Sequence, residues 1–316
     1  MEGTRKTKIN KYLSYFFIMN INKQLAKRLT PEQLSILIDF VKNKKEVPIR
    51  IVYTQGYWDK IAKDNKYELA NRELNALKKS ISEVAKKLNG KKINIIHLGV
   101  GNGVECQILI DAVGAKNISI YSIVDVNPKM LDFSFNKIKE KYPAVRIRKF
   151  NQDIETYGID DICLENKKDG SEINLIVLIA NGVLFSNTDL VKEIYKNMGK
   201  NDYFLLSLEL YSRGKDEEII NPYLIPSVLE LLSNGLRILG YAPKYSDFSG
   251  EIDKKENLLK IYFKSPEEDK LLVLRSYKPD ISKLNSRMSS LGFEIVFAEE
   301  HKDIHTCVAL FKKKLT

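Results

Sequence analysis

The chain has 316 residues, of which 44% are apolar and 29% are charged, and its formal net charge is +10. This composition is typical of a soluble globular protein with a substantial core. No apolar run is long enough to span a membrane, and the early cluster YLSYFFIMNI lacks a small-residue cleavage site. We therefore expect neither a membrane segment nor a secretory signal peptide.

The chain from about residue 22 to 90 has the patterns of helices. Thr30 is a candidate N-cap, and YELANRELNALKKSISEVAKKL has apolar residues at helical spacing. Short runs of Ile, Val and Leu then alternate with helical patterns; these runs are INIIHLGV, ISIYSIVDV, RIRKF, NLIVLIA and YFLLSLELY. Strands that alternate with helices indicate a parallel sheet with right-handed crossovers.

The alternation of strand and helix patterns stops after Tyr211 and returns near residue 271. Further along the chain, FEIVFAEE and TCVALFKKK indicate a closing antiparallel pair of strands. We predict an α/β fold, with a doubly wound Rossmann-like sheet and an extra, mainly helical lobe. Residues 1–73 and the insertion 212–274 would form the extra lobe. Residues 74–211 and 275–316 would form the core.

The run NIIHLGVGNGVECQILID carries glycines at alternate positions between a predicted strand and a predicted helix, namely Gly99, Gly101 and Gly103. In a doubly wound sheet, ligands bind at the carboxyl ends of the strands. Glycines there let a ligand approach the backbone, because a side chain would block it or forbid the dihedral angles. The same glycines could also form a bare structural turn.

Acidic residues follow the next two predicted strands. Asp125 and Val126 end SIVDV, where a carboxylate can accept hydrogen bonds from ribose hydroxyls. A helix cap is the alternative role for Asp125, although the Asn-Pro pair that follows is the more natural cap. Asp153 in FNQDIE could accept a hydrogen bond from an adenine amino group, with Ile154 against the ring.

The glycine spacing differs from the GxGxxG fingerprint of nicotinamide enzymes, and Glu105 beside the turn disfavours a pyrophosphate. The ordered glycines, Asp125 and Asp153 resemble the class I S-adenosylmethionine-dependent methyltransferases. This resemblance implies S-adenosylmethionine as the cofactor and S-adenosylhomocysteine as its product. The acidic residue that usually precedes the first glycine is His97 here, which removes one expected contact to the methionine ammonium.

Within that superfamily, the chain from about Tyr53 to its end resembles the histidine-specific methyltransferase family, which includes the enzyme of ergothioneine synthesis. The resemblance rests on the order of VYTQGYWDKI, KYELANRE, IANGVLFSNTDL, NPYLIPSVLELLSNGLRILG, LLKIYFK, LRSYKP and SLGFEIV. It implies that an amino acid binds between the core and the extra lobe. The residues implied to bind this substrate are Tyr53, Tyr67, Gly182, Asn187, Tyr223 and Ser276. Each tyrosine could instead be an ordinary half-buried aromatic residue.

The position two residues before Ser276 departs from the family, which has there a glutamate that reads the histidine side chain. Here the residue is Leu274, which cannot hydrogen-bond an imidazole. A site that loses such a partner loses its selectivity. We therefore predict that free histidine is not the substrate. A more apolar amino acid, a small amine or a peptide terminus would be N-methylated.

Two other functions stay open. The net charge of +10 could indicate an RNA methyltransferase, although the lysines are spread among acidic residues. The sequence IANGVLF also replaces the (Asp/Asn/Ser)-Pro-Pro-(Tyr/Phe) motif common in enzymes that N-methylate RNA or DNA. A cofactor-binding relative without catalysis is the other alternative, because of His97 and Leu274. No histidine-based catalytic pair is evident, so the sequence predicts a mechanism of positioning and assigns no catalytic residue.

The cysteines and histidines predict no metal site. Cys106, Cys163 and Cys307 stand far apart, which indicates reduced thiols and a cytoplasmic location. His301 and His305 are four residues apart but fall between two predicted strands, so we expect solvated turn residues. The expected partner is a small molecule or a peptide, with nucleic acid less favoured and no membrane.

Overall fold

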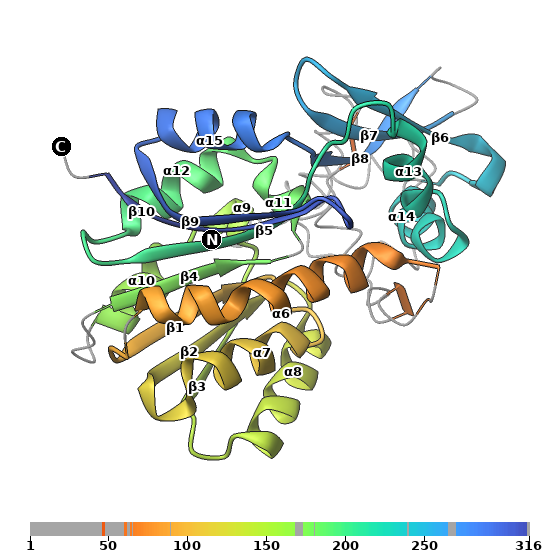
Figure 1. The fold of residues 1–316 in the computed structure, drawn as a ribbon. Helices are drawn as coiled ribbons and strands as arrows, with labels where there is room; N and C mark the ends of the chain where they lie inside the picture. Colours follow the sequence, from red (N-terminus) through yellow and green to blue (C-terminus); the bar gives the residue numbers. More distant parts are fainter. Residues whose placement is uncertain are drawn as a thin grey trace, which may run out of the picture.

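The computed structural model describes residues 46–47, 60–61, 64, 66–88, 90–167, 173–179, 181–238, 240–264 and 270–314. Tyr53 and the helix predicted after Thr30 lie outside these described residues. Figure 1 shows a central sheet between two layers of helices, with a smaller lobe at one end of the sheet.

Seven strands form the central sheet: β1 (Ile93–Leu98), β2 (Ile118–Asp125), β3 (Ile147–Asn151), β4 (Ile173–Leu178), β5 (Tyr203–Glu209), β9 (Phe293–His301) and β10 (Thr306–Lys313). Their order is β3-β2-β1-β4-β5-β10-β9, in which β1 to β5 are parallel and β10 is antiparallel to both of its neighbours. Every residue of β1 and β4 is buried, as expected of apolar strands with helices on both faces. The predicted doubly wound sheet and its closing antiparallel pair are confirmed.

Helices cover both faces of this sheet (Figure 1). One face carries α6 (Glu68–Leu88), α7 (Val104–Val113) and α8 (Pro128–Lys141). The other face carries α9 (Ile154–Tyr157), α10 (Asp160–Lys167), α11 (Gly182–Phe185), α12 (Thr188–Asn197) and α15 (Ile281–Ser290). Side chains of Asn127, Asn187 and Asp280 accept first-turn backbone hydrogen bonds and so begin α8, α12 and α15. A short 3₁₀ helix (Ala115–Asn117) joins α7 to β2.

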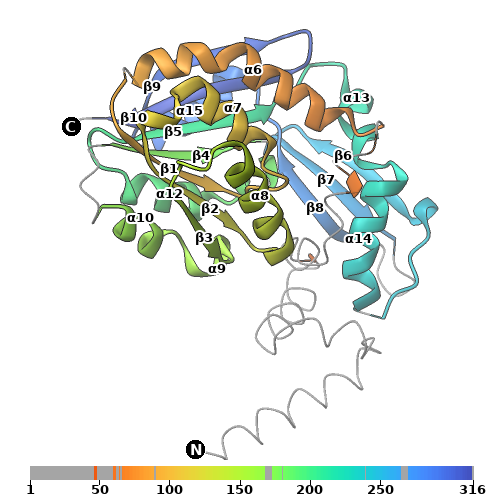
Figure 2. The same ribbon diagram turned by 90° about the horizontal axis from the view of Figure 1, so that it is seen from below.

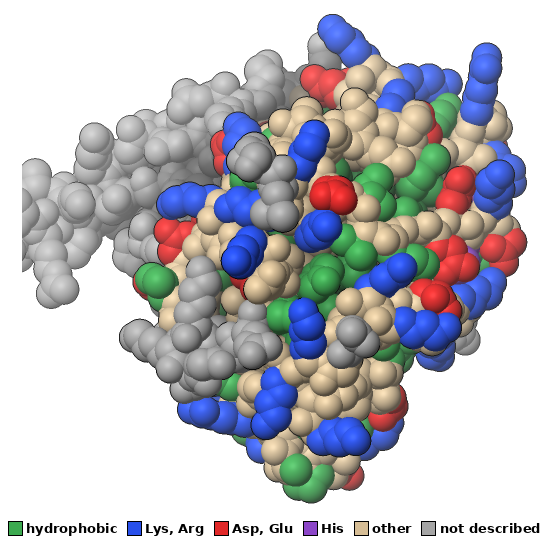
Figure 3. Space-filling view, turned by 60° about the vertical axis from the view of Figure 1, so that its left-hand side comes forward, with side chains coloured by type: hydrophobic (Ala, Val, Ile, Leu, Met, Phe, Trp, Pro, Cys, Tyr) green, Lys and Arg blue, Asp and Glu red, His purple; other side chains and the backbone are tan. Residues whose placement is uncertain are grey.

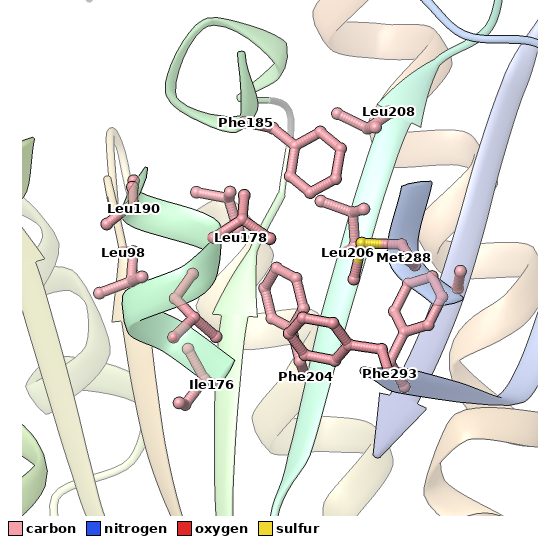
Figure 4. Close-up of a cluster of buried hydrophobic side chains, with 14 of the residues drawn as sticks. Leu98, Ile176, Leu178, Phe185, Leu190, Phe204, Leu206, Leu208, Met288 and Phe293 are labelled. Atoms are coloured by element: carbon pink, nitrogen blue, oxygen red, sulfur yellow. The ribbon is translucent and has the colours of Figure 1, made fainter. Parts of the chain in front are cut away.

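Alternate residues of the strands feed two separate apolar cores. Ile93 and Ile95 of β1 pack with α6, α7 and α8, whereas Ile96 and Leu98 pack on the opposite face. Figure 4 shows part of this second core, where Phe204 lies beside side chains of β4, α12 and α15. The two cores fix the strands from both sides, so the strand ends form a rigid edge.

The smaller lobe is built around an antiparallel sheet of three strands, β6 (Phe248–Asp253), β7 (Leu258–Phe263) and β8 (Leu271–Tyr277). It also contains α13 (Asp216–Ile220), α14 (Pro226–Ile238) and two 3₁₀ helices (Asn221–Tyr223 and Tyr245–Asp247). Figure 2 shows that the first turns of α6 lie beside this lobe. α6 begins before the predicted core boundary at residue 74, and β8 continues past the one at residue 274. The four-part division of the chain therefore stays a prediction.

A buried ion pair joins the sheet to the smaller lobe. Lys278 follows β8 and is 2% exposed, and its Nζ lies 2.7 Å from Oε2 of Glu209, whose side chain is fully buried at the end of β5. Lys278 also donates a hydrogen bond to the Tyr223 hydroxyl at 2.7 Å. The guanidinium of Arg72 in α6 lies 3.8 Å from the other Glu209 oxygen. One buried carboxylate thus connects β5, β8 and α6.

His301 corrects the expectation of a solvated turn. It is the last residue of β9, it is buried, and its Nε2 lies 2.8 Å from the Ser80 hydroxyl of α6. The sequence did not indicate this contact, because α6 and β9 are far apart in the chain. His305 does lie in the turn before β10. Within the described ranges, no cluster of His, Cys, Asp and Glu is arranged to hold a metal ion, and no helix has the length and apolar character needed to cross a membrane.

Replacing Lys278 with leucine should lower the free energy of unfolding by about 3 kcal/mol, because it leaves the Glu209 carboxylate buried without its partner. Urea unfolding followed by circular dichroism measures this change. The matched control is Lys86→Ala, which removes an exposed pair with Glu83 and should cost less than about 1 kcal/mol. Equal stabilities for K278L and K86A would contradict the role assigned to the buried pair.

Candidate functional site

A cavity of about 310 Å³ opens at the carboxyl ends of β1, β2, β3 and β4. The strand order reverses between β1 and β4, which is where doubly wound sheets bind ligands. The first turns of α6 form another wall, from Tyr67 to Leu74. A second hollow between α6 and α7 is lined by none of the residues that the sequence predicts for a site. The cavity at the strand ends is therefore the candidate site.

The glycine turn after β1 forms the floor of the cavity. All three glycines have positive φ angles, which are +69° at Gly99, +55° at Gly101 and +71° at Gly103. Gly99 and Gly101 line the cavity. Gly103 does not; a Cβ there would lie 3.0 Å from side-chain atoms of Ser134, so this glycine lets α7 pack against α8. The turn thus combines a site role expected for two glycines with a packing role for the third.

Asp125 and Val126, at the end of β2, line the cavity beside that turn. The Asp125 carboxylate accepts hydrogen bonds from the backbone N–H groups of Gly101 (3.1 Å) and Asn127 (2.8 Å). Burial raises the pKa of Asp125, and these backbone hydrogen bonds oppose that rise. The cap of α8 belongs to Asn127, which accepts from the Lys129 N–H at 3.1 Å. Asp125 is therefore left to hold the turn and to face the cavity.

Asp153 and Ile154 line the wall that follows β3. Asp153 caps the short helix α9 by accepting from the Glu155 N–H at 3.1 Å. Ile154 is buried against the second core. The order along the edge of the sheet is therefore glycine turn, Asp125, then Asp153 with an apolar neighbour. This is the order expected for the two ends of a nucleoside.

Two glutamates that the sequence analysis did not assign to the site also face the cavity. Glu105 lies in the first turn of α7, and Glu73 lies in α6 with only 4% of its surface exposed. Burial raises the pKa of Glu73 to about 8, and the nearby Glu209 and Glu105 carboxylates add to this effect, whereas Lys278 opposes it. The signal in the sequence was a charged residue on the apolar face of α6, four residues from both Leu69 and Leu77.

His97, in the motif position usually held by an acid, cannot supply a charge. It is buried in β1, and its Nδ1 lies 3.1 Å from the Tyr121 hydroxyl and 3.3 Å from the Cys106 sulfur. Burial lowers its pKa to about 3, so the ring is neutral near pH 7. The side chain fills space beneath the glycine turn and offers no negative charge.

Some of the residues predicted to bind the substrate line the cavity, and others lie outside it. Tyr67 lines the cavity, and its ring lies edge-on to Tyr223 at 6.5 Å between ring centroids. Gly182 begins α11 beside β8, and a Cβ on it would lie 2.6 Å from the Ser276 hydroxyl. Asn187 does not line the cavity. Its side-chain oxygen accepts from the Asp189 N–H at 3.0 Å, and its amide donates to Glu155 at 3.2 Å. All these substrate roles stay predictions.

These features fit S-adenosylmethionine. The glycine turn admits a ligand close to the backbone, since Gly99 and Gly101 line the cavity without side chains. Asp125 can accept hydrogen bonds from hydroxyls, and Asp153 can accept one from an amino group. Buried carboxylates on the α6 side suit a positively charged group.

Comparisons with known proteins agree with this geometry. A family model described as histidine-specific methyltransferase, SAM-dependent, matches residues 29–223. No curated protein matches the chain at a significant level.

Three solved structures illustrate the similarity at the level of whole chains. A S-adenosylmethionine-dependent methyltransferase from Clostridium acetobutylicum is 13% identical, with a TM-score of 0.44, over 76% of this chain and 92% of that one. The magnesium protoporphyrin IX methyltransferase from Synechocystis PCC 6803 is 12% identical, with a TM-score of 0.45, over 89% and 100%. The 1,6-didemethyltoxoflavin-N1-methyltransferase from Burkholderia thailandensis is 12% identical, with a TM-score of 0.43, over 91% and 92%.

Asp125→Ala should weaken the binding of S-adenosylhomocysteine by roughly 10- to 100-fold, because hydrogen bonds to a charged acceptor contribute about 1.5–3 kcal/mol. Isothermal titration calorimetry measures the dissociation constants. The control is Asp132→Ala, since Asp132 is an exposed partner of Lys149 outside the cavity. If D125A bound the ligand as tightly as D132A, Asp125 would have no part in the site.

His97 should make the unfolding free energy depend on pH. Its pKa is about 3 in the folded protein against 6.5 ordinarily, so the unfolded chain binds a proton that the folded chain excludes. The stability is complete above pH 6.5 and falls as the pH is lowered toward 3, by on the order of a few kcal/mol. Urea unfolding at pH 7 and pH 5 should show a smaller loss for His97→Gln than for the wild type. Equal losses would refute a neutral buried His97.

Proposed function

We propose an acceptor for this chain, which belongs to the family of histidine-specific, S-adenosylmethionine-dependent methyltransferases. The chain N-methylates an acceptor other than free histidine. The acceptor class is an amino acid more apolar than histidine, a small amine or a peptide terminus. The methyl donor is S-adenosylmethionine, and its product is S-adenosylhomocysteine.

The environment of Leu274 is the observation that carries the proposal. Leu274 lies on β8, two residues before Ser276, and 4% of its surface is exposed. It pairs with Ile261 of β7 and belongs to the apolar core of the smaller lobe. No hydrogen bond to an imidazole can come from this position. A site without such a polar partner does not select histidine over similar amino acids.

The contacts around the other predicted substrate residues support an acceptor held between core and lobe. Gly182 and Ser276 approach each other across α11 and β8. Tyr67 and Tyr223 bring two phenol groups together near the cavity, and Tyr223 accepts a hydrogen bond from the Lys278 ammonium. Phenol hydroxyls are groups that can orient a carboxylate.

The mechanism that fits this site is one of positioning. S-adenosylmethionine, when bound, supplies a methyl group on a positively charged sulfur, which is already electrophilic. The residues of the chain then hold the acceptor nitrogen in line and exclude water. The acceptor amine must be unprotonated. His97 is neutral and buried beneath the turn, so it does not serve as the base. The proton of the acceptor amine would leave to water or through the tyrosine-lined part of the site.

RNA as the acceptor receives little support from the surface. Figure 3 shows a face where Lys and Arg side chains are scattered, with acidic and apolar side chains between them. Several lysines pair with acids, among them Lys79 with Asp303 and Lys141 with Asp111. A nucleic-acid surface would instead need a continuous basic stripe.

A cytoplasmic location remains part of the proposal, supported by three buried free cysteines.

An acceptor screen with S-adenosylmethionine should give singly or multiply N-methylated products from amino acids, amines or short peptides, with histidine among the poor acceptors. Mass spectrometry of the products measures both the mass gain and the methylated atom.

Tyr67→Phe should raise the KM for the best acceptor several-fold, since a hydrogen bond contributes about 1 kcal/mol.

Histidine emerging as the best acceptor would contradict the proposal, and so would products from RNA alone. RNA binding that falls steeply as salt rises, with methylation of the RNA, would favour the second function. Asp132→Ala serves again as the variant that should leave the acceptor preference unchanged.

A further inference from the structure

We propose that Glu73 of α6 accepts the ammonium group at the methionine end of the cofactor, in place of the carboxylate that the chain lacks at position 97. This inference concerns the cofactor and does not depend on which acceptor is methylated. It does require the cavity at the strand ends to be the cofactor site.

The position of Glu73 suits this contact. Glu73 lines the cavity together with His97 and the glycine turn, so one ligand can reach all of them. It sits on the buried face of α6, where Leu69 and Leu77 anchor the helix in the two apolar clusters that it touches. Its carboxyl group is therefore fixed in place and only 4% exposed. A buried carboxylate calls for a positively charged partner.

The charges around Glu73 leave room for one more cation. Lys278 lies nearby, but its ammonium is 2.7 Å from the Glu209 carboxylate. Arg72 lies 2.9 Å from Glu68 and 3.8 Å from Glu209. Both cations thus lie against Glu209, and Glu73 forms no ion pair with any described residue. A ligand ammonium would balance the cluster.

The two other candidates for this role are weaker. His97 is neutral and its Nδ1 already contacts Tyr121 and Cys106. Glu105 faces the cavity from the first turn of α7, where the positive end of the helix stabilises a carboxylate. The Lys137 ammonium also lowers the pKa of Glu105, although burial has the larger, opposite effect. Glu73 has partial compensation too, from Lys278 and a backbone hydrogen bond at Glu209, but burial still raises its pKa to about 8.

Binding should then be coupled to release of a proton. Burial raises the pKa of Glu73 to about 8 in the free protein; Lys278 lowers it, and Glu209 and Glu105 raise it further. At pH 7 the carboxyl group is mostly protonated, and an ammonium beside it favours the carboxylate. The bound ligand should therefore displace close to one proton at this pH.

The test compares two ligands, S-adenosylhomocysteine and an analogue of it that lacks the amino group. Calorimetric titrations at pH 7, in two buffers of different ionisation enthalpy, give both the affinity and the number of protons released. The variants are Glu73→Gln, which imitates the protonated carboxyl group and should keep the fold, and Glu105→Gln, which removes the competing carboxyl group. Asp132→Ala is the control outside the cavity. Thermal unfolding of each variant shows whether it is folded.

We expect E73Q to bind S-adenosylhomocysteine roughly tenfold more weakly or worse, as for loss of a charged hydrogen-bond partner, and to release no proton. The wild type and E73Q should bind the analogue equally. E105Q should lose less affinity for S-adenosylhomocysteine than E73Q, and D132A should resemble the wild type with both ligands.

Three results would overturn the proposal. The first is that E73Q binds S-adenosylhomocysteine as tightly as the wild type does. Glu73 would then contact the ammonium of the acceptor, or no ammonium at all. Equal weakening of both ligands in E73Q is the second, because it indicates a structural effect. A large loss in E105Q with none in E73Q is the third. Absence of any wild-type binding would instead refute the cofactor site itself, together with this inference.

Discussion

The backbone contact between the glycine turn and the end of β2 is the constraint on which the site depends. The N–H groups of Gly99 and Val100 both donate to the Val124 carbonyl, at 2.9 and 3.1 Å. The Gly101 N–H donates to the Asp125 carboxylate. These bonds hold a turn with positive φ angles against a buried strand. The glycine backbone is consequently exposed to the cavity, and the same hydrogen bonds fix the acid beside it.

Buried charge is the second feature that organises the molecule. Apolar clusters on both faces hold the central sheet, and Glu209, Lys278 and Arg72 add a buried charged contact to the smaller lobe. Charges are costly to bury, so each must find a partner. Glu73 lies next to this network and also faces the cavity. The same electrostatic requirement therefore links the stability of the lobe junction to recognition of a positively charged ligand.

Local signals in the sequence predicted most of the core, and the residues they assigned to a nucleoside after β2 and β3 line the cavity. The apolar runs predicted β1, β2, β4 and β5. The glycines and Asp125 are close in the sequence because only one crossover separates them. The sequence could not reveal contacts between distant segments. Glu73 reaches the cavity because α6 crosses the sheet, and His301 is buried because α6 covers the end of β9. The role of Gly103 also depends on Ser134 of α8, one crossover away.

The sheet of the smaller lobe was partly hidden for a similar reason. LLKIYF indicated β7, and the apolar pattern that returns near residue 271 indicated β8, but β6 carries polar residues between its apolar ones. The isolated bridge between Glu46 and Leu272 adds a contact from the other end of the chain. Antiparallel pairing and long-range contacts of this kind follow from the fold and not from any one segment.

A crystal structure with S-adenosylhomocysteine bound would test the central claim most directly, which is that the cavity at the strand ends holds the cofactor in one orientation. We expect the ribose hydroxyls at Asp125, the adenine between Asp153 and Ile154, and the amino acid end over the glycine turn toward α6. A ligand in the reverse orientation, or bound outside this cavity, would contradict it.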